Sequence, residues 1–274
     1  MKLVDSHLHF EGLNDSSLRL MAMSGIQAIV CMTAIPEVIP EMNKDFSPDA
    51  IFNSCDRILN YYAWIAKQYM IDTYVSVAVS AVGTPFRYKE SLEKMKTYLK
   101  ERNQIVGIGE IGFEPDSPTC SDLKVQEDII ATQIEIAKQF NKTLCFHTPL
   151  TEKLKWFKRY LSMIKEGGLS FDKVIIDHAD NSIVKEVTSS GCYAGISVQP
   201  RRKVRAIDAA LMIKKGDENR ILVNSDAGFL HEADPLSVPR TAFEMKKLGM
   251  KDTEIEKVLW ENPQKAFGLS KESY

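Results

Sequence analysis

The stretch Val4-Asp5-Ser6-His7-Leu8-His9-Phe10 lies almost at the N-terminus and combines an apolar strand pattern with two histidines. In an extended strand alternate side chains share a face, so Asp5, His7 and His9 point to one side. Two imidazoles on one face can bind the same metal ion, and a carboxylate beside them can orient a metal ligand. The spacing alone fits a core or surface role equally well, so the metal interpretation depends on residues further along the chain.

Short apolar runs alternate with amphipathic segments along the whole chain, as expected for strands separated by helical crossovers. The predicted strands are Leu3–His9, Ala28–Thr33, Thr73–Val79, Ile105–Gly112, Thr143–His147, Val174–His178, Tyr193–Val198 and Ile221–Ser225. Most are continuous apolar runs, which is typical of a parallel sheet covered on both faces. Eight strand-helix units in 274 residues predict the α/β fold class, a (β/α)8 TIM barrel whose functional residues belong at the C-terminal strand ends.

Helical patterns fill the segments between the predicted strands. The predicted helices are Asp15–Met23, Pro48–Tyr69, Tyr88–Glu101, Leu123–Phe140, Glu152–Lys165, Ser182–Ser189, Ala206–Lys215 and Val238–Leu248. An extra C-terminal helix, Asp252–Gly268, is expected to break near Asn262–Pro263, because the residue before a proline disfavours the helical region. No Pro-, Gly- or Ser-rich linker interrupts the pattern, which predicts a single domain over residues 1–274.

Composition excludes several classes of protein. With 44% hydrophobic and 26% charged residues the chain is neither disordered nor fibrous. A net charge of −2 gives no global attraction to nucleic acid or anionic membranes, so a polyanion would need a local basic patch. Five scattered cysteines without a Cys-x-x-Cys pair argue against disulfides and a thiolate zinc site. No apolar run is long enough for a membrane span, and Met1–Val4 leads directly into a strand instead of a signal peptide, which predicts a cytoplasmic protein with no membrane partner.

Metal-capable side chains recur at the predicted C-terminal ends of the strands. Glu110 lies within an apolar strand, where a carboxylate needs a bound cation or a salt bridge to a core Arg or Lys. His147, His178 and Asp226 end or follow three further strands, and this repetition indicates one shared site. The predicted metal ligands are His7, His9, Glu110, His147, His178 and Asp226. We expect a structural or rim role for the fifth histidine, His231.

Four imidazoles and two carboxylates on one face suit two divalent ions about 3.5–4 Å apart, with Glu110 bridging and a shared water or hydroxide as nucleophile. Imidazole-rich ligation favours zinc, while manganese, nickel or magnesium would also suit a set that includes carboxylates and water. Asp226, at the rim, is the predicted general base or proton shuttle, and Glu110 is the second predicted catalytic residue.

The motifs Asp-Ser-His-Leu-His-Phe, Gly-Glu-Ile-Gly-Phe-Glu, Phe-His-Thr, Asp-His and Asn-Ser-Asp follow one another in this order. Together they resemble the TatD-like metal-dependent hydrolases of the amidohydrolase superfamily, over nearly the whole chain. The resemblance implies a TIM-barrel hydrolase with His7, His9 and Asp226 at one metal and His147 and His178 at the other. Glu110 would lie between the two ions. Members of the family include DNA-cleaving nucleases.

The surroundings of the metal ligands depart from the family pattern. Pro149 stands where the family usually has Arg, Asn224-Ser225 replaces a common Glu-Thr, and Ala179-Asp180-Asn181 replaces a cysteine-containing segment. These departures place the chain in a divergent, TatD-related subgroup and leave its substrate open.

A basic segment follows the seventh predicted strand, in the rim where an anionic substrate would approach. Its predicted substrate-binding residues are Gln199, Arg201, Arg202 and Lys203. Arginine forks suit phosphate or carboxylate, although a solvated charge run is the alternative.

Three functions remain open from the sequence. The leading hypothesis is a two-metal hydrolase acting on an anionic substrate, with DNA as the first candidate, in the manner of a TatD-like deoxyribonuclease or phosphodiesterase. The same centre would serve hydrolysis of a small amide, lactone or phosphoester. A metal-bearing barrel that acts as a non-catalytic binding protein is the third.

Overall fold

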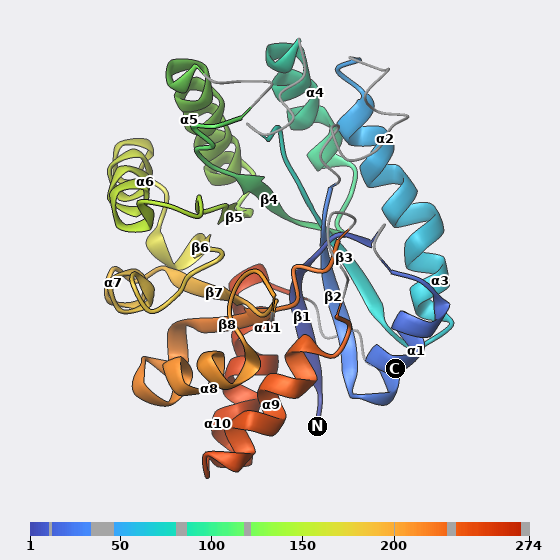
Figure 1. Cartoon of the computed structure of the whole chain (residues 1–274). Coiled ribbons are helices and arrows are strands. Elements are labelled where there is room, and N and C mark those ends of the chain that lie inside the picture. The colour runs from blue at the N-terminus through green and yellow to red at the C-terminus, as the bar shows by residue number, and fades with distance from the viewer. Residues whose placement is uncertain are drawn as a thin grey trace.

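The computed structural model describes residues 1–10, 13–33, 47–80, 87–117, 122–199, 201–228 and 234–269. Its centre is one sheet of eight parallel strands that neighbour one another in chain order and form a nearly closed barrel, with helices around it (Figure 1). The strands are β1 (Leu3–Leu8), β2 (Ile26–Met32), β3 (Asp72–Val77), β4 (Ile105–Ile111), β5 (Thr143–Phe146), β6 (Val174–Ile176), β7 (Tyr193–Ser197) and β8 (Ile221–Asn224). The predicted TIM barrel is confirmed.

The first and last strands meet through two backbone hydrogen bonds at their C-terminal ends. The Asp226 N–H donates to the His7 carbonyl over 2.9 Å, and the His9 N–H donates to the Ala227 carbonyl over 2.6 Å. β1 also packs against β8. The contact therefore brings the N-terminal histidine pair to the same rim as the acid that follows β8.

Helices fill the connections between the strands. They are α1 (Asp15–Met23), α2 (Ala50–Arg57), α3 (Ala63–Lys67), α4 (Tyr88–Lys100), α5 (Leu123–Gln139), α6 (Lys153–Gly167), α7 (Val184–Ser189), α8 (Ala206–Lys215), α9 (Ser237–Lys247), α10 (Asp252–Glu256) and α11 (Asn262–Phe267). The predicted helix Pro48–Tyr69 is interrupted by a π-helical turn, Ile58–Tyr62, between α2 and α3. Within the described ranges, no helix has the length and apolar character needed to cross a membrane.

The predicted break at Asn262–Pro263 is wrong. A second π-helical turn, Lys257–Glu261, leads directly into α11, and the Asn262 N–H reaches back to the Lys257 carbonyl. This wider turn places Pro263 in the first turn of a new hydrogen-bonding register, where its missing N–H removes no bond. The Asn262 amide also donates to the carbonyls of Glu218 and Ile221, which ties the helix to the start of β8.

Two apolar layers stabilise the barrel. The larger lies between the strands and the surrounding helices. The smaller fills the barrel interior with side chains such as Val106 and Leu222, and Phe267 of α11 packs into it from the N-terminal end of the strands. Cys31, Cys55, Cys145 and Cys192 are buried thiols, and Cys120 lies outside the described residues. With the N-terminal end filled, the polar site lies at the opposite end.

Candidate metal centre

The six predicted ligands lie together at the C-terminal end of the barrel. His7 is within β1 and Glu110 within β4, whereas the others follow the strands they were assigned to. His178 and Asp226 have backbone φ angles of 59° and 44°. This left-handed region is unfavourable for residues with a side chain, and such conformations concentrate at functional sites.

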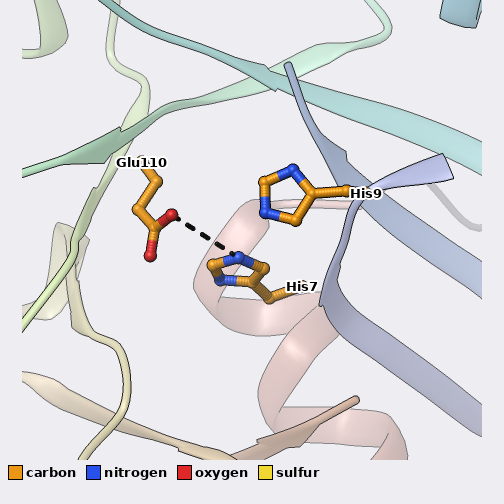
Figure 2. Close-up of side chains that lie close together, drawn as sticks. All are labelled: His7, His9 and Glu110. Carbon is orange, nitrogen blue, oxygen red and sulfur yellow. Dashed lines mark ion pairs between the residues drawn. The ribbon is translucent and has the colours of Figure 1, made fainter. Parts of the chain in front are cut away.

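One group of potential ligands consists of His7, His9 and Glu110, whose ligand atoms all lie within 4.8 Å of one another. Figure 2 shows both rings extending from the same strand, with Glu110 facing them and the dashed line joining it to His7. The His7 Nε2 to Glu110 Oε2 distance is 3.9 Å. Asp226 adds a second carboxylate, with Oδ1 at 3.5 Å from His7 Nε2 and 3.8 Å from His9 Nε2.

A second group consists of Glu110, His147 and His178. Glu110 Oε1 lies 3.0 Å from His147 Nδ1 and 2.7 Å from His178 Nε2. Glu110 thus belongs to both groups, and each of its oxygens faces a different set of imidazoles.

The donor set fits a divalent metal ion. His7 Nε2 is buried and has no hydrogen-bond partner, although the ring is completely shielded from solvent. Its other nitrogen, Nδ1, lies 3.0 Å from Asp177 Oδ2. A carboxylate that accepts the Nδ1 proton leaves the Nε2 lone pair available to a metal. The unsatisfied nitrogen faces Glu110 and Asp226, the carboxylates that would complete the coordination.

Asp177 is a site residue that the sequence reasoning did not assign. We expected Asp5 to orient a ligand, but Asp5 Oδ1 accepts from the Ser225 N–H over 2.9 Å instead. Asp177 takes that role at His7, and it also accepts from the Asn224 amide over 2.9 Å. Gly195 gives it room, because a Cβ at that position would lie 1.9 Å from Asp177 Oδ1.

Glu114 is the second residue that was missed. It follows β4, and its Oε2 lies 3.1 Å from His147 Nε2. His147 is therefore held between Glu110 and Glu114, one carboxylate at each ring nitrogen. The motif Gly-Glu-Ile-Gly-Phe-Glu contained the only sequence signal for this contact, a second acid a few residues beyond the first.

The two carboxylates predicted to be catalytic stay ionised. Burial opposes ionisation of Glu110, but the facing imidazoles, above all His7, hold its pKa well below the usual range. Burial likewise opposes ionisation of Asp226, but the ammonium of Lys203 outweighs it and lowers the pKa. Both side chains are therefore anionic at neutral pH and suited to bind a cation.

The pKa values of His7 and His178 are shifted in opposite directions. Burial disfavours protonation of His7, but Asp177 and Glu110 outweigh it and raise its pKa to about 9. For His178, burial and the ammonium of Lys203 lower the pKa to about 4. A metal ligand must be neutral imidazole, so binding at His7 would release a proton while His178 needs no such change.

The basic segment after β7 divides into two parts. Arg201 and Arg202 are exposed on the rim. Lys203 turns inward, where its Nζ forms an ion pair with Asp226 and lies 3.0 Å from His178 Nδ1. Gln199 donates its amide to the backbone carbonyl of Asp226. His231 lies outside the described residues.

A parallel barrel with imidazoles and carboxylates gathered at its C-terminal rim defines the class of metal-dependent hydrolases. The profile of the family described as TatD related DNase matches residues 4–268. The chain belongs to this family.

Similar proteins extend over nearly the whole chain. An uncharacterized metal-dependent hydrolase of Methanocaldococcus jannaschii is 27% identical over 97% of this chain and 100% of its own length. The crystal structure of a TatD-like protein from Archaeoglobus fulgidus aligns with a TM-score of 0.76 at 22% identity, covering 97% of this chain and 100% of that chain. The phosphotriesterase homology protein of Escherichia coli, complexed with phosphate, aligns with a TM-score of 0.69 at 12% identity, over 97% and 98% of the two chains.

Replacing Asp177 tests whether it prepares His7 for a metal. We expect Asp177→Asn to lower zinc affinity about 10–100-fold, because the His7 Nδ1 proton loses its carboxylate acceptor. Zinc affinity is measured by competition with a chromophoric chelator. Asp172→Asn removes the same charge from an exposed position just before β6 and serves as the control. Equal zinc affinities in the two variants and the wild type would contradict the assignment.

Proposed function

We propose that this protein is a two-metal hydrolase of an anionic substrate, with a phosphodiester in nucleic acid as the first candidate. The observation that carries the proposal is the position of Glu110. Its Oε2 faces His7 at 3.9 Å, while its Oε1 contacts His147 and His178 at 3.0 and 2.7 Å. A carboxylate in this position supports a bridge between two ions.

The remaining ligands divide around this bridge. We propose His7, His9 and Asp226 for one ion and His147 and His178 for the other, with zinc favoured by the imidazole-rich set. Bound ions would lower the pKa of a water molecule and polarise the scissile bond.

Asp226 is the proposed proton acceptor. Its Oδ1 is directed toward His7 and His9, at 3.5 and 3.8 Å, and its Oδ2 is fixed by the Lys203 ammonium. The carboxylate is therefore anionic and lies beside the ligands, as a group that takes a proton during attack must.

The choice of a phosphodiester rests on two features. The family is described by DNase activity, and the exposed Arg201 and Arg202 are on the turn that carries Lys203 into the site. Guanidinium groups beside the entrance would bind phosphates along a strand. The cytoplasmic location expected from the sequence belongs to the same proposal.

Glu110→Gln tests the catalytic centre. We expect the rate of hydrolysis of a chromogenic phosphodiester, measured with zinc or manganese present, to fall by at least about a hundredfold, because the shared charge is lost while side-chain volume is kept. The melting temperature of the metal-free protein is measured beside the rate, and it should change far less. Glu166→Gln, on the exposed face of α6, is the control. Full activity of the Glu110→Gln variant would show that Glu110 has a structural role only.

The two exposed arginines test the substrate class. If Arg201 and Arg202 bind phosphates, replacing both by Ala should flatten the salt dependence of single-stranded DNA binding, by roughly 0.7 in the log–log slope for each phosphate that is no longer neutralised. The matched control replaces Lys158 and Lys165, which are exposed on α6, and removes the same charge.

Identical salt slopes in the wild type and both double variants would remove the rim arginines from the substrate path. The small-molecule alternative, hydrolysis of an amide, lactone or phosphoester, would then be favoured. Pro149 already supports that alternative, since it stands where the family usually has an arginine that could contact substrate.

A further inference from the structure

Lys203 contacts ligands from both halves of the metal centre. Its Nζ pairs with Asp226 Oδ2 and lies 3.0 and 3.3 Å from the two ring nitrogens of His178. The side chain is only 17% exposed. A positive charge is therefore held, largely shielded from solvent, among the groups predicted to bind cations.

The backbone around Lys203 fixes this inward position. The N–H groups of Arg202 and Lys203 both donate to the Gln199 carbonyl, at 3.0 and 2.8 Å, and the Val204 N–H returns to the Ser197 carbonyl at 3.3 Å. The turn therefore follows β7 and returns to its last residue, Ser197. It exposes Arg202 and directs the next side chain into the barrel mouth.

The ammonium contacts two of the side chains that a metal ion would use, Asp226 and His178. A lysine ammonium only donates hydrogen bonds, so Lys203 needs the carboxylate of Asp226 and a lone pair of His178 as acceptors. Both ring nitrogens of His178 already have another partner, because Nδ1 contacts Ser197 Oγ at 2.7 Å and Nε2 contacts Glu110 at 2.7 Å. The ammonium lies 3.3 Å from Nε2, the nitrogen that faces Glu110, so a cation bound at Nε2 would lie close to a second positive charge.

On the basis of the proposed two-metal centre, we propose that Lys203 is a resident competitor of the metal. Its ammonium holds Asp226 and His178 until an ion displaces it, and its charge opposes the entry of the ion. The affinity for the more weakly bound of the two ions is therefore lower than the ligand set alone would allow.

A second lysine lies close to the same histidine. Lys153 donates to the His178 carbonyl over 2.7 Å and lies 3.9 Å from Asp180. Burial lowers the Lys153 pKa, Asp180 opposes this shift, and repulsion from Lys203 adds to it. Two lysines therefore contact His178, one at the ring and one at the backbone carbonyl, and a metal ion bound there would lie close to both.

The test is zinc binding to the metal-free full chain, at fixed pH and salt in phosphate-free buffer, measured by competition with a chromophoric chelator. We expect Lys203→Met to bind the weaker of two zinc ions at least about tenfold more tightly than the wild type, because a charge-assisted contact no longer competes. Lys203→Gln, which removes the charge but stays polar, should shift in the same direction. Lys158→Met removes a charge from the exposed face of α6, away from the site, and its affinity should equal that of the wild type.

Equal zinc affinity in the wild type and both Lys203 variants would overturn the competitor role and leave the proposed function intact. Weaker binding in the Lys203 variants would also overturn it, since Lys203 would then support the site. If neither the wild type nor any variant binds zinc, manganese, nickel or magnesium, the proposed two-metal function fails and the competitor role with it.

Discussion

Two backbone hydrogen bonds between the ends of β1 and β8 make the site possible. They join His7 to Asp226 and His9 to Ala227, and so close the barrel at the rim where the ligands gather. A histidine pair near one end of the sequence and an acid near the other would otherwise have no reason to meet. The closure depends in turn on the apolar interior, which Phe267 seals at the opposite end.

The closed rim creates an electrostatic problem that the surrounding residues resolve. Glu110 and Asp226 are shielded carboxylates, and a buried charge is costly unless cations or hydrogen bonds compensate it. Imidazoles compensate Glu110, and the Lys203 ammonium compensates Asp226. Asp177 orients His7 and depends itself on the space beside Gly195. Both carboxylates are therefore compensated by neighbouring side chains of the same rim.

Most of the fold could be predicted from the sequence because apolar runs and helical patterns alternate without interruption. All eight strands were predicted, and the six residues proposed as ligands, which the structure brings together, were chosen from their places at strand ends. Asp177 was missed because the alternation of side chains along a strand does not extend to it. β6 ends at Ile176 and His178 has a φ of 59°, so Asp177 and His178 both face the site although they are adjacent in the sequence. The continuation of the helix through Pro263 was also missed, since a π-helical turn has no clear sequence signature.

The most direct test of the central claim is a crystal structure of the zinc-loaded protein with anomalous diffraction measured at the zinc edge. We expect two anomalous peaks at the C-terminal rim, one beside His7 and His9 and one beside His147 and His178, with Glu110 contacting both. A single peak that Glu110 does not contact, or zinc bound only elsewhere on the surface, would contradict it.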